Sequence, residues 1–203
     1  AAKVREVGAD IGLALDGDGD RLIVAYEHGE IVDGDHIMAI CAQDLLRRRK
    51  LKKKTLVATI MSNMGLEVAM ERMGGRMVRT GVGDRYVVEC MRRKGFSFGG
   101  EQSGHLVFLD HITTGDGILA ALQLLSVMEN HHKPLSELSG IMENFPQILK
   151  NVRTAGKIKV DAIPGFQHRV GQLSDQLGAS GRILVRAAGT EPGIRVMVDG
   201  QGE

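Results

Sequence analysis

Apolar and polar positions along the first two thirds of the chain follow two different spacings. Short runs of aliphatic and β-branched residues predict strands, and apolar residues three or four positions apart predict helices. The predicted strands are 11–15, 22–26, 55–60, 76–80, 96–98 and 106–109, and the predicted helices are 34–49, 63–73, 84–94, 117–130 and 134–144. Asp84 is the expected cap of the third of these helices. Repeated strand–helix units predict a largely parallel sheet with helices on both faces.

The last sixty residues have a different pattern. Strand-like runs at 148–154, 182–186 and 194–198 surround one helical segment at 165–177. We therefore expect an α/β domain followed by a smaller α+β domain, with the boundary near 140–147.

Composition limits the classes of protein that the chain can belong to. Its 203 residues are 43% hydrophobic and 25% charged with a net charge of +1, which is typical of one large or two small globular domains. The single basic run, 47–54, follows a helical pattern, so its cations are expected to offset the helix dipole and stay in solvent. With no Trp and 3% aromatic residues, recognition of bases by stacking is not expected. The sequence thus predicts no nucleic-acid partner.

Cysteine usage and apolar segments indicate the compartment. Cys41 and Cys90 lie in helical patterns without metal-type spacing, as buried thiols of a reducing compartment do. The chain does not open on a signal peptide, and its longest apolar stretch, 118–128, is interrupted by polar residues. We expect a cytoplasmic protein with no membrane partner.

The segment Asp16–Arg21, Asp-Gly-Asp-Gly-Asp-Arg, lies between two predicted strands. Three carboxylates so close together repel one another unless a cation offsets their charge. Oxygen ligands in a tight Gly-rich loop suit Mg²⁺ or Ca²⁺ better than zinc. Two alternatives are an EF-hand, in which Glu27 would be the twelfth position but Arg21 replaces the required Gly, and a solvated acidic turn without metal.

A second Gly-rich segment, 99–105, follows the predicted strand 96–98. Its glycines allow the backbone to approach a ligand, while Glu101, Ser103 and His105 offer an acceptor, a hydroxyl and a titratable ring. This set of groups suits a sugar. The alternative is an ordinary turn between two strands.

A third segment, 186–195, joins two predicted strands of the last unit. Arg186 and Arg195 flank a loop that contains Gly189 and the Thr190 hydroxyl. Two guanidinium groups with backbone N–H donors form a phosphate-binding arrangement. The alternative is a hairpin whose arginines are solvated.

Together the three segments, with Val82–Val87, Thr113–Gly117 and the Gly-Thr-Glu-Pro at 189–192, resemble the α-D-phosphohexomutase superfamily over nearly the whole chain. Gln102, followed by Phe-Leu-Asp at 108–110, resembles the phosphoglucosamine mutase branch. The other branch, the phosphomannomutases and phosphoglucomutases, typically has Met at that position and is the alternative. A catalytically silent sugar-phosphate-binding module is a second alternative.

The resemblance implies an enzyme of the isomerase class with four domains and Mg²⁺ as cofactor. In such an enzyme a phosphoserine converts glucosamine 6-phosphate into glucosamine 1-phosphate through a 1,6-bisphosphate, on the route to cell-wall amino sugars. The implied metal ligands are Asp16, Asp18 and Asp20, and the implied catalytic residues are Arg21 and His105. The implied substrate-binding residues are Glu101, Ser103, Arg186, Gly189, Thr190 and Arg195.

The resemblance also implies a division of the chain. Residues 1–34 would be the end of domain 2, 35–143 domain 3, and 144–203 a truncated domain 4. The domain with the reactive serine would then be a missing partner, so the isolated fragment is expected to be inactive; a homodimer remains open. The chain departs from the family pattern at Ala187 and Ala188, where Pro and Ser are usual, and at Gly81, where several members have Lys.

Overall fold

The acidic segment closes an antiparallel hairpin in the computed structural model, which describes the chain apart from residues 157–159, 161–162, 188–191 and 201–203. Strand β1 (Ile11–Leu15) pairs with β2 (Leu22–Tyr26), and Leu15 faces Leu22 at the end of the ladder. Strand β3 (Ile31–Val32) completes the sheet β1-β2-β3, and helix α1 (Ala2–Val7) precedes it. The two strands that flank the acidic segment were predicted; α1 and β3 were not.

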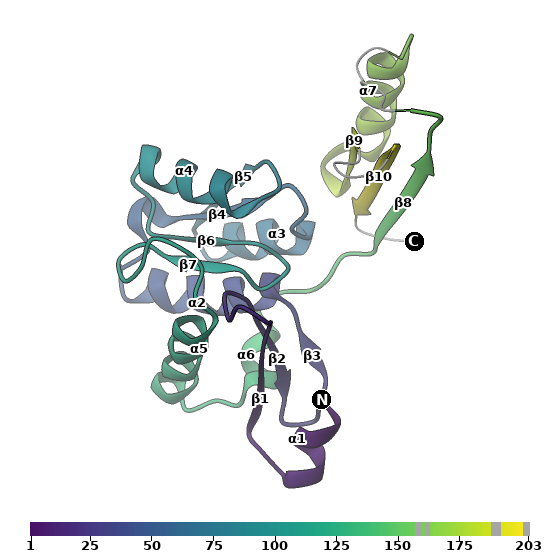
Figure 1. The fold of residues 1–203 in the computed structure, drawn as a ribbon. Coiled ribbons are helices and arrows are strands. Elements are labelled where there is room, and N and C mark those ends of the chain that lie inside the picture. The colour runs from purple at the N-terminus through teal and green to yellow at the C-terminus, as the bar shows by residue number, and fades with distance from the viewer. Residues whose placement is uncertain (157–159, 161–162, 188–191, 201–203) are drawn as a thin grey trace. The chain divides into compact units, whose positions relative to one another are not determined.

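A second sheet has the order β5-β4-β6-β7 (Figure 1). Its strands are β4 (Thr55–Thr59), β5 (Arg76–Thr80), β6 (Phe98–Gly100) and β7 (Leu106–Phe108). Strand β4 is parallel to β5 and β6, whereas β7 returns antiparallel to β6. The accompanying helices are α2 (Gly34–Arg47), α3 (Met64–Arg72), α4 (Asp84–Lys94), α5 (Gly117–His131) and α6 (Leu135–Ser139), and the turn η1 (Lys52–Lys54) precedes β4.

Alternation along β4 explains why helices cover both faces of this sheet. Leu56 and Ala58 point into a core shared with α2, α3, α5 and α6. Val57, one position along, points to the other face and packs with Val87 and Met91 of α4. The predicted α/β architecture with helices on both faces is confirmed.

Three local predictions need correction. The strand predicted at 96–98 is Phe98–Gly100, because Phe98, Gly99 and Gly100 pair with β4 while Phe96 packs in the core under α4. Asp84 does not cap α4: the cap position is Gly83, and Asp84 is the first helical residue. The helix predicted at 134–144 covers only Leu135–Ser139.

Residues 144–203 form the second compact unit, and residues 1–143 the first. In the second unit β8 (Gln147–Arg153), β9 (Gly181–Ala187) and β10 (Gly193–Gly200) form an antiparallel sheet with β10 in the middle. Helix α7 (Phe166–Leu177) and the turn η3 (Gly178–Ser180) lie between β8 and β9. The smaller α+β domain is confirmed. Within the described part of the chain, no helix has both the length and the apolar character needed to cross a membrane.

Candidate functional site

The three aspartates of the hairpin loop lie together at its tip. One carboxylate oxygen from each of Asp16, Asp18 and Asp20 lies within 4.8 Å of the others. The strands on both sides of the loop exclude the EF-hand alternative, which requires helices there. Gly19 has a φ of 73°, so the turn that brings Asp18 and Asp20 together is one that glycine favours.

The charges of this loop are only partly compensated by protein groups. The Nε atom of Arg21 lies 3.6 Å from Asp16 Oδ2 and 3.8 Å from Asp20 Oδ1, and the Arg21 guanidinium is half exposed. Desolvation raises the pKa of Asp16, but the hydrogen bond from the Arg21 backbone N–H, the interaction with the Asp20 carboxyl group and the charge of Arg21 together lower that pKa below its usual value. Asp16 is therefore ionised at neutral pH.

The surroundings of the Asp20 carboxylate show whether this loop fits a metal ion. Its Oδ1 atom is buried and accepts no hydrogen bond from any residue that the structure describes. A buried carboxylate oxygen without a donor is unfavourable, and a cation ligated by oxygen would satisfy it. The donor set of three carboxylates fits Mg²⁺.

His105 approaches the acidic loop from the sugar-type segment. Its Nδ1 atom lies 3.0 Å from Asp20 Oδ2, and its side chain is 5% exposed. Arg21 and His105 also form an isolated antiparallel bridge between their backbones. The structure thus brings together Asp20 and His105, which are 85 positions apart in the sequence.

Backbone atoms join the Gly-rich segment to β2, which follows the acidic loop, and to the start of α2. The Leu22 N–H donates to the Gly104 carbonyl at 3.0 Å, and the Gly34 N–H at the start of α2 donates to the Gln102 carbonyl at 3.0 Å. A Cβ atom at Gly104, whose φ is 90°, would overlap the Leu22 carbonyl, and one at Gly34 would overlap the Glu101 carbonyl. Glycine is therefore required for this approach.

The side chains of the Gly-rich segment have different surroundings. Ser103 is exposed and Glu101 is half-buried. The Glu101 Oε1 atom accepts from the Gly83 N–H at 3.0 Å. The Gln102 amide lies 3.4 Å from Asp33, which caps α2. Ser103 is thus accessible from solvent, while Glu101 connects this segment to the turn before α4.

The segment before α5 also contacts both loops. The Gly117 N–H donates to the Gly19 carbonyl at 2.9 Å, and Asp116 caps α5 by accepting from the Leu119 N–H. A Cβ atom at Gly115 would overlap the His105 ring. No role was predicted for Asp33, Gly115 or Gly117, although the segment 113–117 was part of the motif set that resembles the family.

The predicted phosphate-binding arginines lie in the second unit. Arg195 of β10 is directly opposite Arg186 of β9, and both side chains are half-buried. Desolvation, followed by the charge of Arg195, lowers the pKa of Arg186. Gly189 and Thr190 fall outside the described residues.

Family models match both units. Residues 33–145 match the phosphoglucomutase/phosphomannomutase alpha/beta/alpha domain III, and residues 149–203 match the C-terminal domain of the same family. The chain belongs to the phosphoglucomutase/phosphomannomutase family. The resemblance inferred from the loop motifs is thereby confirmed.

Curated relatives point to one branch of this family. A phosphoglucosamine mutase of Desulfotalea psychrophila is 71% identical over 200 residues, and one of Geobacter sp. is 54% identical over 200 residues. In both cases the match covers 98% of this chain and 44% of the relative, so the chain spans less than half the length of these proteins.

Solved structures share the family fold at lower identity. Aspergillus fumigatus N-acetylphosphoglucosamine mutase has a TM-score of 0.80 at 23% identity, covering 96% of this chain and 45% of that one. A structure of the same enzyme with GlcNAc-6P and magnesium has a TM-score of 0.78 at 22% identity, covering 95% of this chain and 49% of that one.

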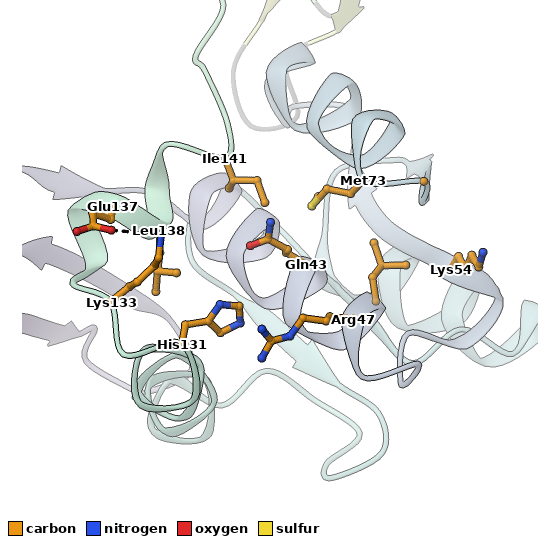
Figure 2. Close-up of a pocket in the computed structure, with 11 residues that line it drawn as sticks. Gln43, Arg47, Lys54, Met73, His131, Lys133, Glu137, Leu138 and Ile141 are labelled. Carbon is orange, nitrogen blue, oxygen red and sulfur yellow. Dashed lines mark ion pairs between the residues drawn. The ribbon is translucent and has the colours of Figure 1, made fainter.

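A cavity of about 690 Å³ lies at the other end of α2 from these family loops. Figure 2 shows its lining, with Gln43 and Arg47 from α2, Met73 after α3 and His131 from α5. Arg47 and His131 belong to the last turns of their helices, where a positive side chain offsets the partial charge of the free carbonyls. Its Lys133 pairs with Glu137 at 3.3 Å. His131 pairs in turn with Asp44 at 3.4 Å, so two of the basic groups of this cavity have acidic partners within the fold. The acidic loop remains the candidate site.

Proposed function

We propose that this chain is part of a phosphohexomutase that interconverts glucosamine 6-phosphate and glucosamine 1-phosphate through a phosphoserine and a 1,6-bisphosphate. One observation carries the proposal: a three-carboxylate loop hydrogen-bonded through its flanking backbone to a Gly-rich loop with an exposed hydroxyl. Two curated relatives, 71% and 54% identical to this chain over 200 residues, are named phosphoglucosamine mutase and support it.

In this proposal the acidic loop holds Mg²⁺ through Asp16, Asp18 and Asp20. The cation, when bound, neutralises charge on the phosphoryl group during transfer. Arg21 is half exposed beside these carboxylates, so its guanidinium is free to turn toward an incoming phosphoryl oxygen. Asp16, ionised at neutral pH, contributes a full negative charge to the ligand set.

The Gly-rich loop orients the sugar. Ser103 offers its hydroxyl, and Glu101 offers the carboxylate oxygen that the Gly83 N–H does not occupy. Gln102, held by Asp33, is the side chain that we assign to the preference for glucosamine over glucose or mannose.

The arginine pair in the second unit binds the phosphate that does not react. Arg186 and Arg195 face each other across two strands, so an anion between them would relieve their repulsion. Gly189 and Thr190 complete this site in the proposal. Because glucosamine 6-phosphate and glucosamine 1-phosphate would both bind these arginines through a phosphate, substitution of Arg186 should impair both directions of the reaction.

Two expectations about these 203 residues follow. No Ser here precedes the acidic loop in a Gly/Ser-rich segment, so the residues alone should not turn over substrate. Their Mg²⁺ affinity should be weak, because the phosphoserine oxygen that would complete the coordination is not among them. Cytoplasmic placement is part of the proposal, supported by the free, buried Cys41 and Cys90, and a homodimer stays a prediction.

A chimera tests the function. These 203 residues would replace the matching segment of the 71%-identical relative, and conversion of glucosamine 6-phosphate would be measured beside conversion of glucose and mannose 6-phosphates. We expect glucosamine 6-phosphate to be the best substrate, and Asp18→Asn in the chimera to abolish turnover. A soluble, folded chimera that prefers mannose or glucose 6-phosphate would support the phosphomannomutase or phosphoglucomutase alternative. A folded chimera that binds phosphosugars without turnover would support the silent module.

A further inference from the structure

The proposed function leaves the basic run at 47–54 without a role. Some of its cations have partners within the fold: Arg48 pairs with Asp44 at 3.1 Å, Lys52 pairs with Asp110 at 2.5 Å, and Lys53 donates to the Lys94 carbonyl. Arg47 and Lys54 differ, because their side chains have no ion pair or hydrogen bond with any residue that the structure describes. Both residues line the cavity of about 690 Å³ at the C-terminal end of α2.

The other charged groups in the lining of this cavity are already paired. The His131 Nε2 atom lies 3.4 Å from Asp44 Oδ1, and the Lys133 Nζ atom lies 3.3 Å from Glu137 Oε2. Lys133 and Glu137 are both more than half exposed, so solvent screens their attraction and the pair contributes little. The charge that remains uncompensated in the cavity is therefore the positive charge of Arg47 and Lys54, which calls for an anion.

Figure 2 shows how these side chains are arranged along the cavity. Arg47 lies between Lys133 and Lys54 in this view, and Gln43 lies beside it on α2. The rest of the lining is apolar and comes from Leu46, Met73, Leu138 and Ile141. A hollow of this size, with an apolar wall and a few polar groups, is typical of sites for small organic molecules. An inorganic anion alone would leave the apolar wall in contact with water.

We propose that this cavity binds a small organic phosphate, with at least two negative charges beside an apolar ring, as in a nucleoside diphosphate. The Arg47 guanidinium donates to the phosphoryl oxygens, and Lys54 adds a second positive charge. Met73 and Ile141 cover the ring, and the Gln43 amide meets one of its polar atoms. All of these residues belong to the unit 1–143, and the cavity is separate from the acidic and Gly-rich loops, so the proposal does not depend on the proposed function.

Binding of ADP by the chain itself tests the proposal. ADP would be titrated in Mg²⁺-free buffer, so that a cation at the acidic loop cannot recruit it, while the methyl NMR signals of Met73 and Ile141 are followed. We expect saturable shifts with a dissociation constant below about 1 mM. Arg47→Gln should raise this constant about tenfold, which corresponds to about 1.4 kcal/mol, and Lys54→Gln should also raise it. Pyrophosphate, which lacks the ring, should bind more weakly than ADP, and adenosine, which lacks the charge, should not bind.

The matched control is Arg49→Gln, which removes the same charge two residues from Arg47 at a position that is not part of the lining. It should leave the dissociation constant unchanged, as should Arg186→Gln in the other unit. Thermal unfolding would verify that each variant is folded. Absence of saturable methyl shifts, or an equal loss of affinity in Arg47→Gln and Arg49→Gln, would overturn this site and leave the proposed function untouched. Equal affinity for ADP and pyrophosphate would overturn the assignment to an organic phosphate.

Discussion

An arginine faces an aspartate at one end of the β9–β10 ladder and another arginine at the other end. At one end Arg182 faces Asp199, and two hydrogen bonds of 2.7 Å join them. Four residues along β9, Arg186 faces Arg195 instead. Like charges directly opposite each other on neighbouring strands are unfavourable. The first pair stabilises the fold, whereas the second retains a repulsion between its two guanidinium groups.

Breaking the satisfied pair should have the largest effect. Arg182→Ala leaves the buried carboxylate of Asp199 without its guanidinium partner. We expect the free energy of unfolding to fall by about 3–5 kcal/mol, as measured by urea denaturation. Arg169→Ala, on the exposed face of α7, is the control and should change it by less than about 0.5 kcal/mol. An equal loss in both variants would mean that the Arg182–Asp199 pair is not what stabilises this end.

Asp35 in the first unit is a buried charge of a third kind. It accepts a hydrogen bond from the Asn63 N–H at 2.8 Å. Burial raises its pKa to about 6 from 3.8. The folded state therefore holds a proton that the unfolded state releases, so the contribution of this group to stability falls as pH rises from about 4 to 6. A shift of about two pKa units corresponds to about 3 kcal/mol.

Asp35→Asn should remove this pH dependence, because an amide resembles the protonated acid. The free energy of unfolding would be measured by urea denaturation at pH 4.5 and at pH 7.5. Its decrease from the lower to the higher pH should be smaller in Asp35→Asn than in the wild type. The exposed Glu71→Gln variant is the control and should keep the wild-type difference. An unchanged pH dependence in Asp35→Asn would show that another group causes it.

The repelling pair should matter for anions. Arg186→Gln removes one of two charge-assisted contacts to a phosphate, and we expect inorganic phosphate to bind about tenfold more weakly, or about 1.4 kcal/mol. NMR titration of the Arg195 side chain with phosphate would measure this, and Arg169→Gln should have no effect. Equal phosphate affinity in Arg186→Gln and the wild type would show that Arg186 does not bind phosphate and that these strands form an ordinary hairpin.

The smallest expected effect concerns stability without phosphate. Arg186→Gln removes the repulsion from Arg195, so the free energy of unfolding should stay equal or rise by up to about 1 kcal/mol. Thermal and urea unfolding in phosphate-free buffer would measure it. A clear loss of stability would mean that Arg186 has a structural role like that of Arg182.

Local pattern was sufficient for much of the fold. The strand at 76–80 was predicted with its observed ends, because its residue types and the glycines before it are local signals. Strand β6 was misplaced because Gly99 and Gly100 have no side-chain pattern, and their pairing with Val57 and Ala58 depends on a distant strand.

The site was predictable in its parts but not in its contacts. The acidic loop was evident from spacing alone. The contact between His105 and Asp20 depends on β7 returning antiparallel beside β6, which no local signal indicated. The direct opposition of Arg186 and Arg195 likewise depends on the register of two strands.

The Leu22 N–H donates to the Gly104 carbonyl, so the strand that follows the acidic loop is joined to the Gly-rich loop by main-chain atoms, and no side chain at 101–103 takes part in that bond. The side chains to which we assign sugar binding and the three aspartates are therefore held in place by different contacts. If the proposed function holds, we expect substitutions at 101–103 to change the sugar preference while the three aspartates stay in place. Gly104 must stay glycine in such variants, since a Cβ atom there would overlap the Leu22 carbonyl of β2.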